Sequence, residues 1–229
     1  MTRPYVLLSV AVSVDGYIDD ASPDRLLLSN DADFDRVDQV RADSDAILIG
    51  AGTISADNPR LIVKSERRQA ERVASGRPAH PLKVTVTASG ALDPTAKFWH
   101  HGTEDHRPVV YTTDTGAATA TARLGELADV VPLGAEVDFA ALLDDLGDRG
   151  VKRLMVEGGS RIHTEFLSAG LADELQLAIG PTLVGQPAAP RFLNEADFPG
   201  GPTRRMRLVD VSQIGDVALL RYHPQERPQ

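Results

Sequence analysis

The residues best suited to chemistry lie where an apolar run meets two glycines, at Arg153-Leu-Met-Val-Glu157-Gly158-Gly159-Ser160. The run predicts a buried strand, and the residues after it have helical spacing. A helix N-terminus offers unpaired N–H groups and partial positive charge, and glycines let a phosphate approach the backbone closely. The pattern therefore indicates a phosphate cradle, although a tight turn that binds nothing would have the same sequence.

A second turn of this kind, Gly50-Ala-Gly52-Thr53, follows another apolar run and precedes Asp57. Two glycine turns at strand ends could hold the two ends of one dinucleotide, which is more specific than either turn alone. The spacing matches neither the Rossmann glycine fingerprint nor a Walker loop with its Lys-Ser/Thr pair. Hydride transfer on a different α/β fold is therefore favoured over phosphoryl transfer.

Four charged side chains near these turns each have a functional and a structural interpretation. Glu157 lies at a strand end, where side chains project into the usual ligand crevice, so a functional role is favoured. Asp57 either caps its turn or faces a ligand, whereas Asp15 more simply shapes the turn at Gly16. Arg41 either stabilises the C-terminus of a helix or anchors a substrate phosphate.

Composition excludes several other kinds of chemistry. The sequence has no cysteine, which excludes disulfides, a thiolate nucleophile and a cysteine-ligated zinc. His100, His101 and His106 lack the spacing of a zinc protease, so no metal is expected. No Gly-x-Ser-x-Gly elbow occurs. A net charge of -9 argues against nucleic acid or an anionic membrane as partner, and the ligand is expected to be a small molecule.

The elements that must position these residues alternate along the chain, which predicts an α/β fold with a mixed, mostly parallel sheet. Strands are expected at Val6–Ser13, Ala46–Ile49, Leu82–Thr87, Val109–Thr112, Asp129–Pro132, Arg153–Glu157 and Glu174–Ile179. Helices are expected at Asp31–Ala42, Ala117–Leu127, Phe139–Arg149 and Ser160–Ala169, with Ser29 or Asn30 capping the first and Asp138 the third.

The end of the chain departs from a simple Rossmann pattern. Met206–Ile214 and Val217–Tyr222 are strand-like runs joined at Gly215-Asp216, which predicts an antiparallel C-terminal hairpin. Residues 1–229 have no composition break, so one domain is expected, with an ordered core over 1–222 and a frayed tail over 223–229.

Three polar or ambiguous segments complete the expectations. Ser65–Pro81 and Phe98–Pro108 resemble surface insertions, and the Arg-rich stretch Lys64–Arg77 is expected to be a solvated loop, with contact to an adenosine 2′-phosphate as the alternative. The apolar run Tyr5–Val12 is valine-rich and stops at a turn, so it predicts a strand rather than a signal peptide. A cytoplasmic protein is the expectation that follows.

The motifs also resemble a known family. Ser13-Val-Asp15-Gly16, the run Val40-Arg41-Ala42-Asp-Ser-Asp-Ala-Ile-Leu-Ile-Gly50-Ala-Gly52-Thr53, then Ala56-Asp57-Asn58-Pro59-Arg60-Leu61, and Val156-Glu157-Gly158-Gly159 occur in the order seen in the pyrimidine reductase family of riboflavin biosynthesis. The resemblance covers nearly the whole chain. It implies a three-layer, dihydrofolate-reductase-like fold and a homodimer. It also implies that NADPH reduces a ribosylaminopyrimidine 5′-phosphate to its ribityl form, with hydride going to C1′ of an open-chain imine.

The resemblance assigns site residues one by one. The substrate positions are matched by Ser29, Arg41, Leu61, Lys64 and Glu157. Glu157 and Asp57 are the expected catalytic residues. The cofactor positions, taken together with the glycine turns, are Ala11, Leu27, Gly50, Gly52, Thr53, Asp57, Thr87, Ala88, Gly158, Gly159, Ser160, Arg161 and Ile162. A protonated Glu157 or a bound water is the expected source of a proton for the imine nitrogen.

The departures from the family pattern leave alternatives open. Bifunctional members carry a cysteine-ligated zinc deaminase domain, so deamination is not expected of this cysteine-free chain. Ser9 replaces a lysine that those members often have, and Thr87-Ala88 replaces an aspartate followed by serine. The departures favour a stand-alone reductase of a 2,5-diaminopyrimidine. The alternatives are a relative acting on another pterin or pyrimidine and a dinucleotide-binding protein without catalysis.

Overall fold

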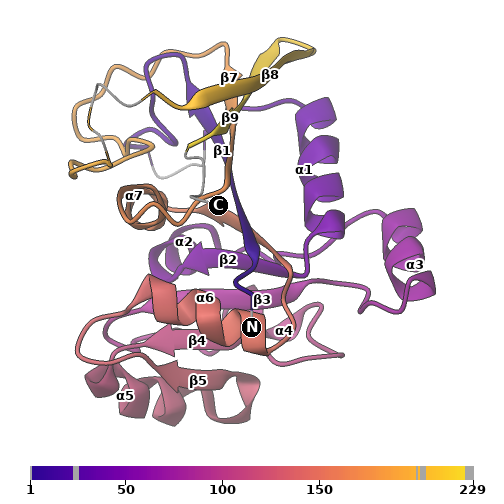
Figure 1. Cartoon of the computed structure of the whole chain (residues 1–229), viewed down its shortest axis with the longest axis vertical. Coiled ribbons are helices and arrows are strands. Elements are labelled where there is room, and N and C mark those ends of the chain that lie inside the picture. Colours follow the sequence, from indigo (N-terminus) through magenta and orange to yellow (C-terminus); the bar gives the residue numbers. More distant parts are fainter. Residues whose placement is uncertain (1, 23–25, 200, 202–204, 225–229) are drawn as a thin grey trace. The chain divides into compact units, whose positions relative to one another are not determined.

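A computed structural model describes residues 2–22, 26–199, 201 and 205–224 (Figure 1). By their contacts the residues divide into two compact units. The first unit comprises Met1–Pro4 and Asp38–Met155, and the second comprises Tyr5–Val37 and Val156–Gln229. The chain passes from one unit to the other inside helix α1 (Asp31–Asp43) and inside strand β6 (Arg153–Gly158).

Parallel strands form the sheet of the first unit. β2 (Ala46–Gly50), β3 (Leu82–Thr87), β4 (Val109–Thr112) and β5 (Asp129–Pro132) lie side by side in the order β5-β4-β3-β2, and neighbours pair in parallel. Every residue of β2 and β4 is buried. Burial on both faces explains why these strands are continuous apolar runs rather than alternating ones.

Six helical segments belong to the first unit alone. They are α2 (Ala51–Asp57), α3 (Glu66–Ala74), α4 (Lys97–His100), α5 (Asp114–Leu124), a short 3₁₀ segment (Gly125–Leu127) and α6 (Phe139–Asp148). The side chain of Asp138 accepts hydrogen bonds from the first turn of α6, which confirms the expected cap. Thr113 caps α5 in the same way, so this helix begins three residues before the predicted Ala117.

The Arg-rich stretch is the main error of the sequence prediction. Lys64–Arg77 was expected to be a solvated loop, yet most of it forms α3, with Arg68 and Arg72 buried. The Arg68 guanidinium lies 2.9 Å from a carboxylate oxygen of Asp38, and Arg72 donates two 2.7 Å hydrogen bonds to backbone carbonyls. Because these acceptors satisfy the guanidinium groups, arginine can face the interior where its composition indicates solvent.

The second predicted insertion, Phe98–Pro108, also begins inside the protein, because Phe98 and Trp99 are buried. Lys83 in β3 is fully buried beneath it, and its ammonium donates to the carbonyl oxygens of Arg60 at 2.5 Å, Phe98 at 2.8 Å, and His101. Burial lowers the pKa of Lys83 to about 8. One buried cation therefore holds two backbone segments in place through three carbonyl groups.

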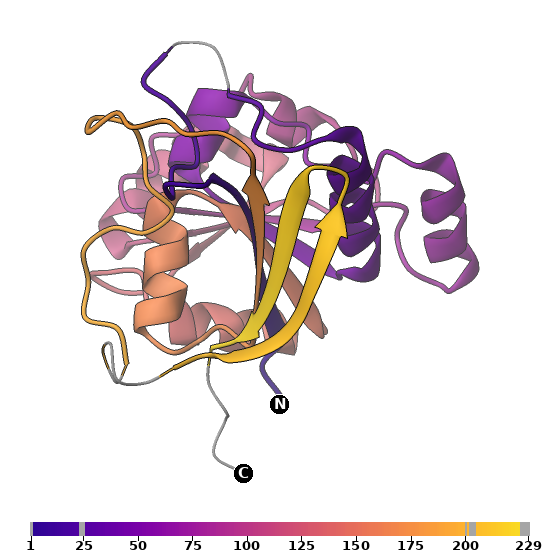
Figure 2. The same cartoon turned by 90° about the horizontal axis from the view of Figure 1, so that it is seen from above.

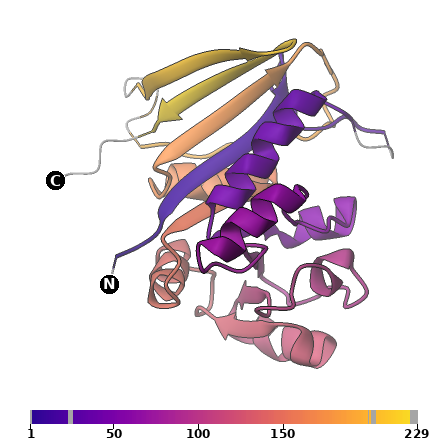
Figure 3. The same cartoon turned by 90° about the vertical axis from the view of Figure 1, so that its right-hand side faces the viewer.

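The second unit contains a mixed group of strands, which confirms the predicted hairpin. β1 (Tyr5–Ser13) pairs in parallel with β7 (Glu174–Gly180), and β9 (Val217–His223) pairs antiparallel with both β7 and β8 (Arg207–Ile214). Figure 2 shows the β8–β9 hairpin in yellow, and Figure 3 shows β8, β9, β7 and β1 side by side in that order. Residues 225–229 of the predicted frayed tail lie outside the described residues, whereas His223 ends β9.

A close backbone approach fixes the segment that leads into α1. A Cβ atom on Gly180 would lie 1.9 Å from the carbonyl oxygen of Leu28, so only glycine fits at the end of β7. Asn30 then accepts a 3.0 Å hydrogen bond from the N–H of Asp33 and caps α1, which decides between the two predicted capping residues. Ser29 is therefore held between two fixed points of the backbone.

His163 in helix α7 (Ser160–Ser168) predicts that the protein loses stability in acid. Both ring nitrogens are buried without a hydrogen-bond partner among the described residues, and burial lowers the pKa of His163 to about 4. As the pH falls from 6.5 towards 4, the unfolded chain takes up a proton that the folded chain refuses. The unfolding free energy should therefore fall by about 2–3 kcal/mol between pH 7 and pH 4.5 on account of this group.

Urea unfolding at the two pH values measures this loss. His163→Leu should remove that part of the pH dependence, whereas a substitution at the exposed His100, His100→Leu, should retain it. An equal loss in the wild type and in both variants would contradict the assignment to His163.

Candidate active site

The N-terminus of α7 is the best-formed candidate for phosphate binding in the second unit. β6 ends at Gly158, and Gly159 follows with φ of 88°, a left-handed conformation that favours glycine. Gly159 is the N-cap of α7 and provides no side-chain hydrogen bond to its first turn. The first turn therefore presents N–H groups that no capping side chain occupies, as the sequence pattern requires.

The side chains around this turn differ in exposure. Ser160 donates its hydroxyl hydrogen to the carbonyl oxygen of Arg191, which ties the start of α7 to the following loop. Ile162 is buried, whereas Arg161 is exposed and lies 3.9 Å from Glu165. The backbone of Ser160 and Arg161, rather than the Arg161 side chain, is thus the fixed part of the candidate cradle.

Glu157 lies in strand β6, two residues before Gly159. Its side chain is half-buried, in contrast to the fully buried Met155 and Val156 before it. A strand-end carboxyl next to an open helix N-terminus is well placed to act on a ligand whose phosphate lies at that helix. Glu157 is therefore the strongest candidate in the second unit for a group that handles protons.

The remaining predicted residues of the second unit come from three places. Ala11 is partly buried in β1 opposite Ala178 of β7, and the side chain of Leu27 is 69% exposed. Ser29 donates its hydroxyl hydrogen to Asp33, and Asp33 in turn accepts a 2.6 Å hydrogen bond from Arg36. The Ser29 hydroxyl is therefore oriented by a buried carboxylate that sequence reasoning missed.

Asp15 has a structural role in this unit. Its carboxylate accepts hydrogen bonds from the Ser13 hydroxyl at 2.6 Å and from the N–H groups of Val184 and Gly185. The hydrogen bond from Ser13, with those from the two backbone N–H groups, lowers the pKa of Asp15. These contacts support the simpler sequence interpretation, in which Asp15 shapes its turn.

The second glycine turn, residues 50–53, forms the N-terminus of helix α2 in the first unit. Gly50 is the last residue of β2 and the N-cap of α2, where it contributes no side-chain hydrogen bond, and Gly52 and Thr53 lie within α2. Asp57 is exposed at the last position of α2. Asn58 follows with φ of 43° and ends the helix through a hydrogen bond from its N–H to Ile54.

A compact group contains the predicted phosphate anchors. Arg41, in the last turn of α1, donates a 3.2 Å hydrogen bond to the carbonyl oxygen of Ile62. The N–H of Lys64 donates to Asp38 at 2.5 Å, while the Lys64 side chain is exposed. Leu61 is buried with φ of 51°, a strained conformation for a branched residue. The structure thus brings Arg41 and the segment 61–64 together in the first unit.

Asp38 was not predicted, although it organises this group. Its carboxylate accepts from the N–H groups of Lys64 and Ser65 and pairs with the buried Arg68. An aspartate in the middle of a helix has no sequence signal that separates it from a solvent-exposed one. The arginine-rich stretch after it was expected to be solvated, so no sequence pattern indicated a buried acidic partner.

The strand end at Thr87 and Ala88 is a further predicted cofactor position in the first unit. Thr87 is buried and its hydroxyl accepts a 3.2 Å hydrogen bond from the N–H of Gly90, while Ala88 is exposed. The carbonyl oxygen of Ala88 accepts a 2.7 Å hydrogen bond from the Thr113 hydroxyl. This strand end is rigid, and it presents backbone rather than charged side chains.

No group of three or more histidine, aspartate or glutamate side chains among the described residues could hold a metal ion. No helix in the described part of the chain is long and apolar enough to cross a membrane.

Parallel strands that run into uncapped helix N-termini are features of an α/β protein able to hold a dinucleotide. Comparison with known families is more specific, because residues 4–220 match the model of the RibD C-terminal domain. The chain belongs to this family, as the sequence motifs indicated.

Relatives with known names agree with this membership. A 2,5-diamino-6-ribosylamino-4(3H)-pyrimidinone 5′-phosphate reductase from Archaeoglobus fulgidus is 34% identical over 215 residues, which cover 93% of this chain and 95% of the relative. A riboflavin biosynthesis protein RibD from Bacillus amyloliquefaciens is 29% identical, and the match covers 94% of this chain but 56% of that protein.

Solved structures confirm the predicted fold class. A pyrimidine reductase-like protein from Corynebacterium diphtheriae has a TM-score of 0.79 at 22% identity, over 96% of this chain and 91% of its own. The three-layer α/β fold of the dihydrofolate-reductase type, with its mixed sheet and antiparallel C-terminal hairpin, is therefore established.

Proposed function

We propose that this protein is a nicotinamide-dependent reductase of the riboflavin pathway, which reduces a ribosylaminopyrimidine 5′-phosphate to its ribitylamino form. The observation that carries the proposal is the N-terminus of α7, which has no side-chain cap and follows Gly159. Glu157 lies next to it, near the end of strand β6. The name of the Archaeoglobus fulgidus relative, which matches over nearly its full length, supports the same activity.

The residues have distinct roles in this proposal. The first-turn N–H groups of α7 hold the pyrophosphate of the cofactor, and Arg41 with Lys64 bind the substrate phosphate. Ser29, fixed by Asp33, hydrogen-bonds the substrate, and Glu157 faces its sugar or pyrimidine. These roles require no side chain to change its charge except Glu157.

The reaction adds a hydride to C1′ and a proton to the adjacent nitrogen of an open-chain imine, which leaves a ribitylamine. NADPH, when bound, supplies the hydride. The protein aligns the imine, and Glu157 delivers the proton directly or through a water. Ser9, Thr87 and Ala88 differ from the bifunctional enzymes, which favours the 2,5-diaminopyrimidine as substrate.

Turnover assays test the function directly. Purified protein is mixed with NADPH or NADH and with either the 2,5-diaminopyrimidinone or the 5-aminouracil ribosyl phosphate, and loss of nicotinamide absorbance is followed. We expect consumption of NADPH with the diaminopyrimidinone at the highest kcat/KM. Binding of NADPH without consumption on either pyrimidine would overturn the reductase assignment and leave a dinucleotide-binding protein.

We also propose that a second copy of the chain covers strand β8. This strand ends the sheet and exposes Leu208, Val209 and Val211 by 51%, 39% and 59%. An exposed apolar edge strand favours aggregation in a protein that stays monomeric.

Val211→Glu should convert a dimer to a monomer in analytical ultracentrifugation, whereas Val73→Glu, at a 58% exposed valine of α3, should not. A monomeric wild type would contradict the proposal.

A further inference from the structure

A hollow lies at the amino ends of the parallel strands of the first unit. Its lining includes Asp45 just before β2 and the first residues of β3, β4 and β5, which are Leu82, Val109 and Asp129. The cavity volume is about 560 Å³, within the range of small-molecule sites. Because β2 separates it from Gly50, and a strand rises about 3.3 Å per residue, the hollow is roughly 16 Å from the start of α2.

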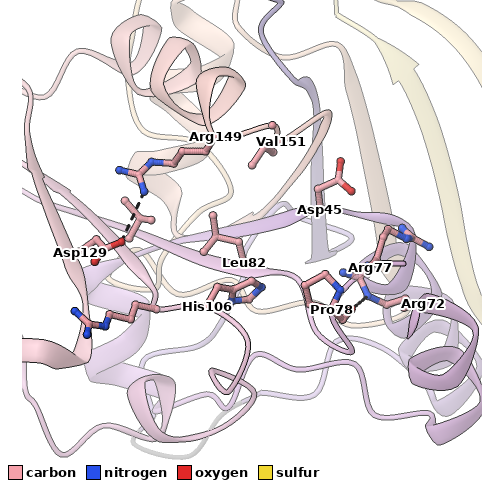
Figure 4. A pocket seen from close by; sticks show the side chains of 12 residues that line it. Asp45, Arg72, Arg77, Pro78, Leu82, His106, Asp129, Arg149 and Val151 are labelled. Atoms are coloured by element: carbon pink, nitrogen blue, oxygen red, sulfur yellow. Dashed lines mark hydrogen bonds and ion pairs between the residues drawn. The ribbon is translucent and has the colours of Figure 1, made fainter. Parts of the chain in front are cut away.

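The charge of this hollow is opposite to that of the chain. Four arginines line it, Arg72, Arg77, Arg107 and Arg149, against the two acids Asp45 and Asp129. The lining is therefore positive by two charges, while the whole sequence has a net charge of -9. Figure 4 shows side chains from α3, from the strand starts and from the loops between them gathered around the same space.

Two of the arginines already have strong internal partners. Arg149 lies 2.6 Å from Asp145 and 3.8 Å from Asp129, and Arg72 donates to the carbonyl oxygens of Ala42, Ser44 and Pro78. Both groups are held in fixed positions. Because Arg72 is 2% exposed, a ligand in the hollow would meet preorganised positive charge at Arg149, and Arg72 would act on it from beneath the surface.

The other two arginines lack a close acidic partner within the described residues. Arg77 donates to the Ser75 hydroxyl at 3.2 Å, and Arg107 lies 3.9 Å from Glu126, whose side chain is 94% exposed. A pair this long and this exposed contributes little. The carboxylate of Asp45 is held by the N–H groups of Lys152 and Arg153 and offsets only part of the positive charge at Arg72.

The positive groups also repel one another. Burial and the nearby charge of Arg77 lower the pKa of Arg72 to about 10. In addition, Nδ1 of His106, another lining residue, is buried without a hydrogen-bond partner among the described residues. An anion bound between these groups would relieve the repulsion and provide hydrogen-bond acceptors.

Apolar side chains line the remainder of the hollow. Pro78, Leu82 and Val151 contribute to it (Figure 4), together with Val109. A bare inorganic anion would leave this surface uncovered, whereas a molecule with a flat ring would cover it and place its anionic group near the arginines.

We propose that this hollow is a binding site for a small molecule that combines a phosphate monoester with a ring, at the opposite strand ends from the α2 turn. A phosphate monoester fits because planar guanidinium groups bind its oxygens with paired, charge-assisted hydrogen bonds. The site is independent of the proposed reductase activity, because none of its lining residues belongs to the predicted active site.

Amide NMR of the ¹⁵N-labelled full chain, with AMP as the probe, tests the location of binding. We expect shifts at the amides of Arg77, Arg107, Val109 and Gly150 that saturate with AMP. Inorganic phosphate should bind at the same amides about tenfold more weakly, and adenosine should not bind there. No shifts, or shifts confined to residues 50–53 and 159–162, would overturn the proposal.

Variants test the chemistry of the site. The double substitution Arg77→Ala and Arg107→Ala should weaken AMP binding at these amides at least tenfold, and Arg77→Lys with Arg107→Lys should restore part of it. Arg67→Ala, at an exposed arginine of α3 paired with Glu71, is the matched control and should bind AMP as the wild type does. Undiminished binding in the double variant would overturn the proposal.

Discussion

Replacement of Glu157 by glutamine is expected to lower kcat for pyrimidine reduction by about 100-fold and to leave NADPH affinity within about twofold. Glutamine keeps the size and hydrogen-bonding capacity of the half-buried side chain, but it cannot deliver a proton to the imine nitrogen. The N–H groups of α7 that we propose to hold the pyrophosphate are unchanged by the substitution. Single-turnover absorbance measurements and a fluorescence titration with NADPH provide the two quantities.

Controls separate proton delivery from simple positioning. Glu126→Gln, at a carboxylate that is 94% exposed, should leave both quantities unchanged. If Glu157 only positions the substrate, Glu157→Gln should raise KM while kcat stays near that of the wild type. That outcome would remove Glu157 from the proton-transfer step while leaving the reductase assignment intact.

Lys83→Met is expected to have the largest effect on folding stability, about 4 kcal/mol. Methionine fills a similar volume, but it leaves the carbonyl oxygens of Arg60, Phe98 and His101 without their shared donor. Replacing a buried charge by an apolar residue is tolerated when its partners are also replaced, which is impossible for backbone carbonyls. Urea unfolding monitored by the fluorescence of Trp99 measures the loss.

The exposed Lys152 provides the matched control for this substitution. Lys152→Met removes the same charge from the surface and should change the unfolding free energy by less than about 0.5 kcal/mol. Equal stability of the two variants would show that the carbonyl oxygens around Lys83 find other donors, such as water.

Most strands were predictable because they are buried and therefore occur in the sequence as short apolar runs, as in β2 and β4, although β5 is partly exposed. The predicted bounds of β3, β4 and β5 agree with the structure, and those of β1 and β7 differ by one residue at an end. Helices α2, α3 and α4 were not predicted. α2 is short and contains a glycine, and α3 buries arginines through hydrogen bonds that no local pattern reveals.

The candidate site was predictable to the extent that backbone conformation determines it. Gly159 has the positive φ that its place between strand and helix demands, and Glu157 precedes it on the strand. Asp33 and Asp38, which orient Ser29 and the segment at Lys64, could not be predicted. Their importance depends on partners brought close by the fold rather than on their neighbours in the sequence.

The division of the chain also has a consequence for how the protein forms during synthesis. The N–H of Val6 in β1 bonds the side chain of Asp173, 167 positions later, whereas the continuous segment Asp38–Met155 makes up nearly all of the first unit. At about 5–20 residues per second, a ribosome needs on the order of 10–30 s to deliver that partner. The chain of the first unit can therefore be fully synthesised while β1, an apolar strand made earlier, still lacks its pairing partner β7.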